Sequence, residues 1–371
     1  MKRLRLGMVG GGEGSFIGGV HRIAARLDDQ FELVAGAFSS SPEVAKRSGE
    51  ALYVDAGRCY ANWQEMAQQE AARADGIEVV AIVTPNHLHV PVAKAFLEHG
   101  IHVICDKPLG VMLAEAQALA QVIETSGCHF ILTHNYSALP MVREARARIA
   151  NSEIGDIRAI EVEYLQDWLN DRLELTDNKQ ASWRGNPAMA GAGAIGDIGT
   201  HAWQLAAFVS GMEPELVRGE LLTRIEGRVL DDEVYAEMRY ANGARGRLWA
   251  SQVAPGFEND LRLRIVGSRA TISFRQQQPE ILEIHPHHGN SYVVTRNGVN
   301  NHDSVRHQCR TPAGHPEGYL EGFAQIYREA AIKIRGGKAP LLPGIAEGLA
   351  GMKFIETVRE SSHRGGEWLE W

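Results

Sequence analysis

Short apolar runs alternate with longer amphipathic segments through the first 135 residues, and this alternation constrains the fold more than any other feature. The runs lack regular polar alternation, as expected for strands covered on both faces. Segments 90–99 and 113–125 carry apolar residues at helical spacing. The alternation predicts βαβ units and a parallel sheet with helices on both sides. The expected strands are Leu4–Val9, Phe31–Phe38, Val79–Val83, His102–Cys105 and Phe130–Thr133.

The pattern changes after about residue 155, where strand-like segments follow one another without helices between them. Asn242-Gly243 lies between two of these segments and is typical of a hairpin turn. Such a run predicts an open, mainly antiparallel sheet. Helices are expected near Pro316–Ile334 and Pro343–Glu360. The expected strands are Arg158–Tyr164, Val217–Leu222, Glu233–Arg239, Gly246–Ser251, Leu261–Gly267, Thr271–Phe274 and Ile281–His285.

A chain of 371 residues is long enough for two hydrophobic cores. We therefore predict an α/β Rossmann domain with a doubly wound parallel sheet over residues 1–136, which binds a dinucleotide. A C-terminal α+β domain with the open sheet follows over residues 137–371 and serves substrate binding, catalysis and oligomerisation. The C-terminal helix could pack back on the first domain. One flat face of the open sheet would suit the interface of a homodimer or homotetramer.

Composition excludes several classes of partner. The net charge of −8 leaves no excess of Lys and Arg to neutralise phosphates, so neither nucleic acid nor an anionic membrane is expected as a partner. No apolar run is long enough to span a membrane, and the basic N-terminus lacks the apolar core of a signal peptide. The four cysteines stand far apart, which indicates reduced thiols in a cytoplasmic protein.

The first expected strand runs into a glycine-rich segment, Gly10-Gly11-Gly12-Glu13-Gly14-Ser15. Glycines at a strand-to-helix junction let the backbone approach a pyrophosphate, whose charge the helix N-terminus favours. The strict G-x-G-x-x-G pattern fails because Ser15 occupies its third glycine position. Alternatively, Gly10 and Gly12 are the first two glycines, and Gly18 is the close-packing third after an insertion. An ordinary turn is the remaining alternative.

The end of the second expected strand reads Ser39-Ser40-Ser41 and lacks the carboxylate that usually bonds the ribose 2′-hydroxyl of NAD. Hydroxyls do not repel a 2′-phosphate, and Lys46 or Arg47 could lie near it. This composition leans towards NADP or dual use. Alternatively, Ser41 with Pro42 only caps the next helix.

Four motifs in order resemble the Gfo/Idh/MocA family of oxidoreductases, named for glucose-fructose oxidoreductase and inositol dehydrogenase. Behind the glycine loop, Thr84-Pro85-Asn86 with His89 matches its T-P-N-x-x-H, and Asp106-Lys107-Pro108 matches its E-K-P with Asp in place of Glu. Segments 183–187 and 191–201 match its W-R-x-x-P, glycine-rich and D-x-G-x-H run. The long glycine loop and the missing acidic residue depart from the family, as does Gln204 where Asp is common.

The resemblance implies that Lys107, Asp197 and His201 are the catalytic residues. Lys107 follows an expected strand at the sheet edge where ligands bind, so its ammonium could hydrogen-bond the reacting oxygen. Asp197 and His201 are four residues apart, which would place them on one face of a helix. An imidazole suits a general base. For an isolated pair, a helix cap and a core histidine would be the alternative.

Further residues are expected around the cofactor and the substrate. The cofactor, NAD or NADP, is expected to contact Gly10, Gly12, Gly14, Ser15, Phe16, Ile17, Ser39, Ser40, Thr84, Pro85, Asn86, His89, Asp106, Lys107 and Asn135. The substrate is expected to contact Tyr136, Gln166, Trp168, Trp183, Arg184 and His315, and Tyr164 could join them, because aromatic faces and amide or guanidinium donors suit polyhydroxylated rings. No metal is expected, since the histidines at 285, 287 and 288 lack neighbouring carboxylates or thiols.

The expected activity is hydride transfer between a secondary hydroxyl of a sugar or cyclitol and NAD(P). Two alternatives stay open. One is an NAD-dependent glycoside hydrolase that oxidises its substrate transiently, as some relatives in the family do. The other is a non-catalytic nucleotide-binding sensor, although a sensor would not need the proton acceptor that Lys107, Asp197 and His201 imply.

Overall fold

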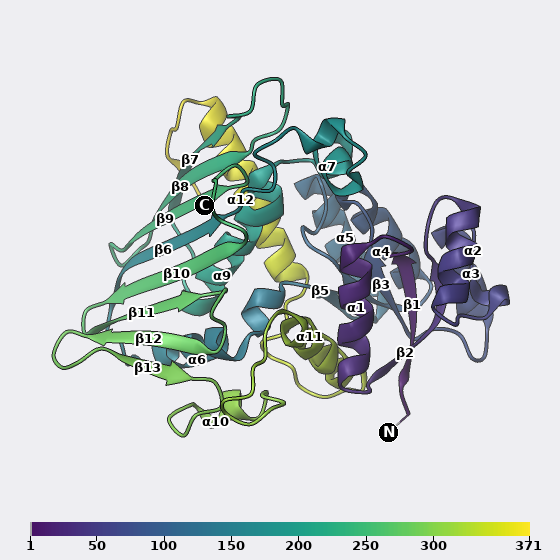
Figure 1. Cartoon of the computed structure of the whole chain (residues 1–371), viewed down its shortest axis with the longest axis horizontal. Coiled ribbons are helices and arrows are strands. Elements are labelled where there is room, and N and C mark those ends of the chain that lie inside the picture. Colours follow the sequence, from purple (N-terminus) through teal and green to yellow (C-terminus); the bar gives the residue numbers. More distant parts are fainter. Residues whose placement is uncertain (1) are drawn as a thin grey trace. The chain divides into compact units, whose positions relative to one another are not determined.

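The computed structural model describes residues 2–371, which form two compact units (Figure 1). The first unit comprises the residues up to Asn135 together with Leu320–Ala350. The second comprises Tyr136–Tyr319 and Gly351–Trp371. The chain therefore returns to the first unit after building most of the second.

The first unit contains a five-stranded sheet in the order β2-β1-β3-β4-β5, and all of its pairs are parallel. The strand order reverses between β1 and β3, which is where ligands bind in doubly wound sheets. The chain at Pro343 is bonded to the edge strand β5, because the Leu132 amide donates to the Pro343 carbonyl at 3.0 Å. The strands are β1 (Leu4–Gly10), β2 (Phe31–Ala37), β3 (Val79–Val83), β4 (His102–Cys105) and β5 (Phe130–Leu132).

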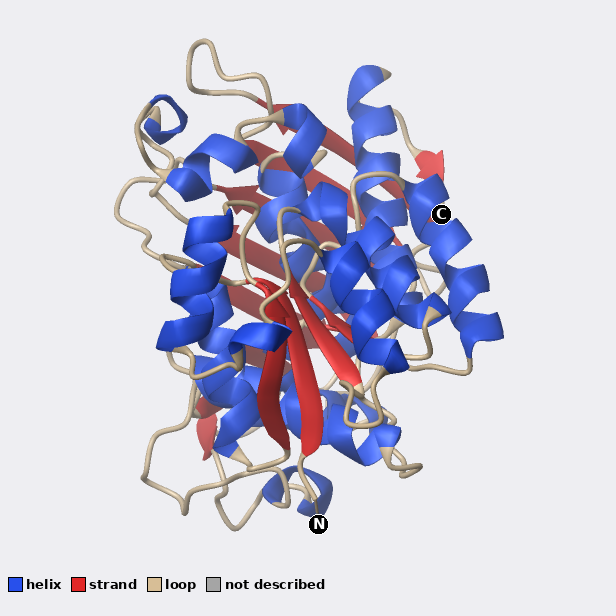
Figure 2. Ribbon diagram, turned by 90° about the vertical axis from the view of Figure 1, so that its right-hand side faces the viewer, coloured by secondary structure: helices blue, strands red, loops and turns tan. Residues whose placement is uncertain are grey.

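Helices cover both faces of this sheet, as Figure 2 shows for the red strands at its centre. On one face, α11 packs beside α1, where the Tyr327 hydroxyl lies 2.9 Å from His21 Nδ1 and its ring meets Phe31 edge to face. The helices are α1 (Phe16–Leu27), α2 (Pro42–Ala51), α3 (Trp63–Ala72), α4 (His89–Glu98), α5 (Leu113–Ser126) and α11 (Tyr319–Ile334), with short 3₁₀ turns η1 (Ala56–Arg58) and η2 (Asn86–Leu88).

The second unit is built on a nine-stranded sheet in the order β13-β12-β11-β10-β6-β9-β8-β7-β14. Every pair is antiparallel except β6 with β9. The strands are β6 (Ile157–Leu165), β7 (Leu216–Leu222), β8 (Glu233–Arg239), β9 (Arg245–Ser251), β10 (Asp260–Gly267), β11 (Ala270–Arg275), β12 (Ile281–Pro286), β13 (Tyr292–Thr295) and β14 (Leu369–Glu370). In Figure 1 these strands form a twisted fan, mostly green.

The two faces of the nine-stranded sheet differ in polarity. Ile160 and Val162 of β6 and Ile265 of β10 are buried on the face covered by α6 and α9. Their neighbours Glu161 and Arg264 point to the opposite face, as the two-residue period of a strand requires. The helical segments are α6 (Pro140–Ala150), α7 (Lys179–Arg184), α8 (Pro187–Ala190), α9 (Thr200–Ser210), α10 (Asp303–Arg306) and α12 (Ile345–His363), with the 3₁₀ turns η3 (Asn135–Ala138) and η4 (Leu173–Leu175) and the π-helical turn η5 (Ile195–Gly199).

The predicted fold class is confirmed: a parallel Rossmann sheet is followed by a mostly antiparallel sheet. Asn242-Gly243 forms the predicted hairpin between β8 and β9, with Gly243 at φ +83°. Two short strands, β13 and β14, were not predicted. The segment before His201 begins as a π-helical turn and not as an ordinary α-helix.

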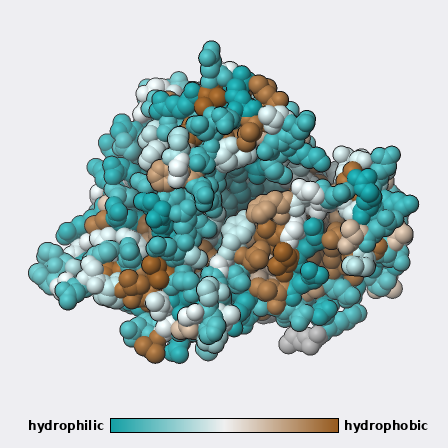
Figure 3. Space-filling model, viewed as in Figure 1, coloured by the Kyte–Doolittle hydropathy of each residue, from teal (hydrophilic) through white to brown (hydrophobic). Residues whose placement is uncertain are grey.

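All four cysteines are free thiols, and Cys105 is fully buried. Among residues 2–371, none of the helices combines the length and apolar character that crossing a bilayer requires. The surface in Figure 3 is mainly hydrophilic, with apolar side chains in scattered groups.

Gly18 is needed where α1 passes the glycine loop. A Cβ on Gly18 would lie 2.4 Å from Gly11 Cα, whereas one on Gly19 would meet only the end of Arg22 at 4.0 Å. We expect Gly18→Ala to lower the free energy of unfolding by about 1–3 kcal/mol through overpacking and to weaken NADH binding. Urea unfolding and NADH fluorescence titration measure both effects. The matched Gly19→Ala variant should be neutral or slightly stabilising, and equal effects of the two variants would contradict this account.

Candidate active site

The glycine loop of the first unit leaves space for a phosphate group. Ser15 caps α1 by accepting the Gly18 amide at 3.2 Å, so the first turn of the helix begins directly after the loop. Gly14 has φ +77°, and a Cβ placed on it would have nothing within 4 Å. Gly18 closes against Gly11, so the structure supports Gly18 as the close-packing glycine. A helix N-terminus behind open backbone suits a pyrophosphate.

The end of β2 lies against this loop. The Gly12 amide donates to the Phe38 carbonyl at 3.2 Å, and the Glu13 amide donates to Ser48 Oγ of α2 at 2.9 Å. Ser41 caps α2 by accepting the Val44 amide, as the capping alternative predicts. The Ser39 hydroxyl accepts the Ser41 amide at 3.1 Å. Ser39 and Ser40 are the predicted ribose contacts at this strand end. Ser40 is exposed, and the Ser39 hydroxyl is already bonded to the backbone of the same turn.

His89 joins the ends of β3 and β4. Its Nδ1 lies 2.7 Å from the Pro108 carbonyl oxygen, and its Nε2 lies 2.9 Å from that of Thr84. Burial lowers the pKa of the imidazole, which is 1% exposed. Because carbonyl oxygens only accept hydrogen bonds, the neutral ring can donate to one of them at a time. The side chain therefore packs between the two motif segments and donates to one of them at a time, whether or not it also contacts a cofactor.

Lys107 follows β4 in a turn that Asp106 holds. The Asp106 carboxylate accepts the Thr133 hydroxyl at 2.7 Å and the Lys107 amide at 3.0 Å, and the Lys107–Pro108 peptide is cis. Lys107 itself is half-buried. Burial, together with the charge of Lys107, lowers the pKa of the neighbouring His134 to about 3. The Lys107 ammonium thus lies beside a neutral imidazole that sequence reasoning did not single out.

Several buried polar atoms in this part of the first unit have no hydrogen-bond partner within residues 2–371. They include Thr84 Oγ1, after β3, and Asn135 Nδ2, after β5. Buried polar atoms are normally satisfied, so such atoms at the ligand edge of a doubly wound sheet indicate a missing polar ligand. Both residues belong to the predicted cofactor set, and the open backbone at Gly14 agrees with the same interpretation. The residues present therefore fit a dinucleotide.

His134 should make stability depend on pH. Its pKa lies below the ordinary value of 6.5, so the folded protein binds fewer protons there than the unfolded chain does. The stabilisation is complete above pH 6.5 and is lost as the pH falls towards 3. We expect this group to cost about 2 kcal/mol between pH 7 and pH 5.

Urea unfolding at the two pH values, followed by circular dichroism, measures this effect. His134→Gln should reduce the pH-dependent loss of stability by that amount, whatever it does to stability at pH 7. The exposed His288→Gln is the control and should leave the loss unchanged. An identical loss in His134→Gln and in the unmodified protein would refute the assignment.

Asp197 lies in η5 of the second unit and is held by two donors. Arg184 Nε donates to Asp197 Oδ2 at 3.1 Å, and Gln252 Nε2 donates to the same atom at 2.9 Å. The Asp197 side chain is 20% exposed. A carboxylate that accepts from a guanidinium and from an amide is fixed in direction. Sequence reasoning missed Gln252, which follows β9 without any recognisable motif.

A second aspartate fixes the start of η5. The Asp231 carboxylate accepts the Gly193 and Ile195 amides, each at 2.8 Å, and its carbonyl accepts the Ala194 amide at 2.8 Å. Burial raises the pKa of Asp231, and these amides act in the opposite direction. A Cβ on Gly193 would lie 1.8 Å from the Asp231 carbonyl oxygen, so only glycine fits there. The glycine-rich stretch therefore serves close packing in front of Asp197.

His201 lies four residues after Asp197, in the first turn of α9, which continues directly from η5. Aromatic rings surround it. Its ring centroid lies 4.9 Å from that of Tyr136 and 6.2 Å from that of Tyr164. Burial raises the pKa of both phenols, and the Asp197 charge raises it further. Since the Asp197 charge reaches the two rings that His201 contacts, the predicted Asp197 and His201 share one neighbourhood in the second unit.

Four of the predicted substrate residues form one hydrogen-bonded chain in this unit. Tyr136 and Tyr164 hydroxyls lie 2.7 Å apart, and Asn259 Oδ1 accepts both the Tyr164 hydroxyl at 2.8 Å and the Gln166 amide at 2.7 Å. Gln166 Oε1 in turn accepts the Trp168 indole N–H at 3.0 Å. Asn259 connects the chain, and no motif marked it in the sequence.

Arg184 extends this group towards Asp197. Its guanidinium lies 4.2 Å from the ring centroid of Trp183 and 5.9 Å from that of Trp168. His315 does not join these residues. It is exposed on the loop before α11, and its carbonyl accepts the Thr311 hydroxyl at 2.7 Å.

Two family models match most of the chain. Residues 4–134 match the oxidoreductase family with an NAD-binding Rossmann fold, and residues 142–273 match the GFO/IDH/MocA C-terminal domain.

Solved structures and curated proteins agree with these matches. An oxidoreductase from Sinorhizobium meliloti is 46% identical with a TM-score of 0.91, and each chain is fully covered. An inositol dehydrogenase homologue from Azotobacter vinelandii in complex with NAD⁺ is 33% identical with a TM-score of 0.96, covering 100% of this chain and 98% of that one. An inositol dehydrogenase homologue from Azotobacter vinelandii in complex with NADH and myo-inositol is 31% identical with a TM-score of 0.93, covering 100% of this chain and 98% of that one. Levoglucosan dehydrogenase from Pseudarthrobacter phenanthrenivorans is 32% identical over 76% of each chain.

Proposed function

The chain belongs to the Gfo/Idh/MocA family of oxidoreductases, and we propose that it oxidises a secondary hydroxyl of a sugar or cyclitol with NAD as the hydride acceptor. Its Rossmann domain is of the NAD-binding kind. Myo-inositol and levoglucosan, the compounds named for its relatives, are both rings that carry several hydroxyls. The reverse reduction of the corresponding ketone belongs to the same proposal.

One observation carries the choice of substrate class. In the second unit, Asp197, Arg184, Gln166 and Trp168 present a carboxylate, a guanidinium, an amide and an indole within one connected group. Donors and acceptors fixed by hydrogen bonds suit the many hydroxyls of a sugar or cyclitol, and aromatic faces suit its C–H groups. Such a group offers little to a long apolar substrate.

The catalytic roles follow from the chemistry of each side chain. The Lys107 ammonium donates a hydrogen bond to the reacting oxygen and stabilises the negative charge that develops there. His201 Nε2 or Nδ1 accepts the hydroxyl proton, and Asp197 orients the substrate hydroxyls and favours the protonated imidazole. When bound, the nicotinamide accepts the hydride. The Gly14 turn, the Ser15 cap, Thr84 and Asn135 would hold the dinucleotide.

A panel of cyclitols and sugars, each offered with NAD and with NADP, tests the proposal by the rise in nicotinamide absorbance. We expect net NADH formation with at least one secondary alcohol of this panel. We further expect Lys107→Ala to lower kcat at least a thousandfold while changing the Kd for NADH less than about threefold. Asn259→Leu, which removes the acceptor between Tyr164 and Gln166, should act mainly on the KM for the sugar.

Two results would contradict this assignment. Turnover of Lys107→Ala at the rate of the unmodified enzyme would remove the role given to its ammonium. Release of a free sugar from a glycoside without net NADH would instead identify a hydrolase that recycles its cofactor.

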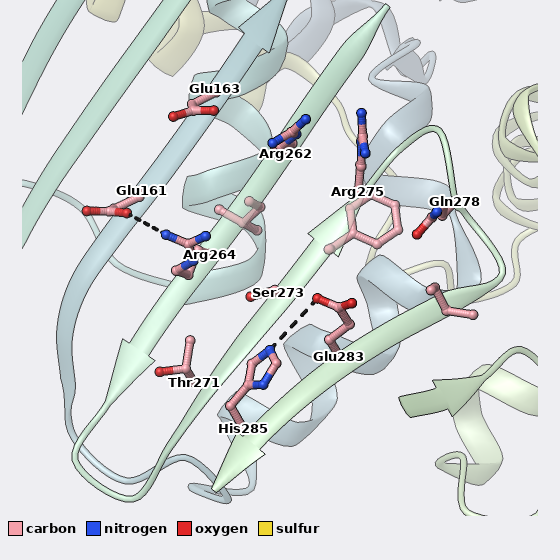
Figure 4. Close-up of a pocket in the computed structure, with 13 residues that line it drawn as sticks. Glu161, Glu163, Arg262, Arg264, Thr271, Ser273, Arg275, Gln278, Glu283 and His285 are labelled. Carbon is pink, nitrogen blue, oxygen red and sulfur yellow. Dashed lines mark hydrogen bonds and ion pairs between the residues drawn. The ribbon is translucent and has the colours of Figure 1, made fainter. Parts of the chain in front are cut away.

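We also propose that the polar face of the nine-stranded sheet joins copies of this chain in a homodimer or homotetramer. This face includes a hollow of about 690 Å³ lined by charged side chains of β6, β10, β11 and β12 (Figure 4). Glu161 pairs with Arg264 at 3.3 Å and with Arg247 at 2.5 Å, and the stacked rings of Tyr235 and Trp249 lie on β8 and β9. Aromatic residues and arginine are enriched at subunit interfaces, and opposite charges on such a face can pair across the interface.

Light scattering after size exclusion tests this interface. The unmodified protein should elute as a dimer or tetramer. Arg264→Glu should shift it towards the monomer, because a carboxylate beside Glu161 then concentrates negative charge on the face that the partner subunit would cover. Arg364→Glu, which breaks a comparable ion pair with Glu360 on α12, is the control and should leave the mass unchanged. A monomeric unmodified protein at micromolar concentration would sink the proposal.

A further inference from the structure

An ion pair lies at the junction of the glycine loop and α2. Arg47 Nε and Nη2 each lie 3.0 Å from the same carboxylate oxygen of Glu13. Both side chains are more than half exposed, so the pair is not part of the core. Neither the packing of the first unit nor the proposed chemistry at Lys107 uses these two residues.

The backbone places this pair beside the adenosine ribose. In a doubly wound fold the ribose lies between the first glycine loop and the end of the second strand. The Gly12 amide, one residue before Glu13, is bonded to the Phe38 carbonyl directly after β2, and the Glu13 amide is bonded to Ser48 of α2. Glu13 therefore extends from the glycine loop that borders the ribose site, and Arg47 extends from α2, the helix that follows the end of β2 and contacts this loop through Ser48.

The charges of this pair bear on the choice between NAD and NADP. The two dinucleotides differ by a dianionic phosphate on the 2′-hydroxyl of the ribose. The end of β2 carries serines and no carboxylate, so the usual acidic residue that bonds the 2′-hydroxyl is absent from Ser39–Ser41. Arg47 is a suitable phosphate ligand, but its Nε and one Nη already face Glu13.

We propose that Glu13 makes this enzyme prefer NAD, because its carboxylate occupies Arg47 and places a negative charge beside the ribose 2′-position. Glu13 thus performs from the glycine loop the task that an acidic residue after β2 performs in other NAD-binding sites. Arg47 is a latent phosphate ligand, which becomes available when Glu13 loses its charge. This inference rests on the cofactor part of the proposed function and does not depend on which sugar is oxidised.

Fluorescence titration with NADH and with NADPH tests this inference without any substrate. The unmodified protein should bind NADH at least about tenfold more tightly than NADPH. Glu13→Gln keeps the size of the side chain and its backbone contact with Ser48, and it should shift the NADPH-to-NADH affinity ratio about tenfold towards NADPH. Adding Arg47→Ala to Glu13→Gln should abolish most of that gain, because the freed guanidinium supplies it.

Asp29→Asn is the matched control. It breaks the exposed ion pair of Asp29 with Arg3, 2.6 Å long and in the same unit, and should leave the affinity ratio within about twofold. A preference of the unmodified protein for NADPH would overturn the inference, and so would an unchanged ratio in Glu13→Gln or a gain that survives removal of Arg47. Failure to oxidise any sugar would leave these results intact, whereas failure to bind either dinucleotide would overturn the cofactor assignment itself.

Discussion

A single buried imidazole determines how the functional edge of the Rossmann sheet is built. His89 lies within hydrogen-bond distance of the carbonyl oxygens of Thr84 and Pro108, which follow two adjacent strands, and its neutral ring fills the space between the two turns and donates to one of them at a time. Lys107 lies in one of these turns, and Asp106 ties that turn to Thr133 after the next strand. Three consecutive strand ends are thereby connected through side chains. A lysine on such a turn has a defined direction, which a mobile surface lysine lacks.

The second unit fixes the direction of its functional side chains in a different way. Asp197 does not lie on a strand end but on a π-helical turn, whose first amides are bonded to the Asp231 carboxylate. Arg184 and Gln252 then fix the direction of the Asp197 side chain. Each of these supporting residues comes from a different part of the chain. Their common effect is to present one carboxylate and one imidazole from a short, well-anchored helical segment.

Periodicity was enough to predict the parallel sheet, the hairpin at Asn242-Gly243 and most strand bounds to within one or two residues, because these depend on local patterns. Motifs were enough to predict Lys107, Asp197 and His201 as candidates, whose catalytic roles stay predictions. Contacts between distant segments were out of reach. Gln252, Asn259 and Asp231 carry no local signal, since their importance comes only from what folding places beside them. The same applies to Glu13, whose partner Arg47 lies 34 residues away.

The one parallel pairing in the large sheet, between β6 and β9, has a consequence for how this fold can diversify. Glu161 and Arg247, which pair across these strands, are 86 residues apart. The part of this connection before β7, residues 166–215, contains Trp168, Trp183 and Arg184 and contributes no strand to the sheet. Loop-closure entropy grows only with the logarithm of loop length, so doubling the length of a flexible loop costs about 0.6 kcal/mol. Insertions and deletions in this segment are thermodynamically cheap, and a pocket can be reshaped for a new ring while the sheet keeps its pairing.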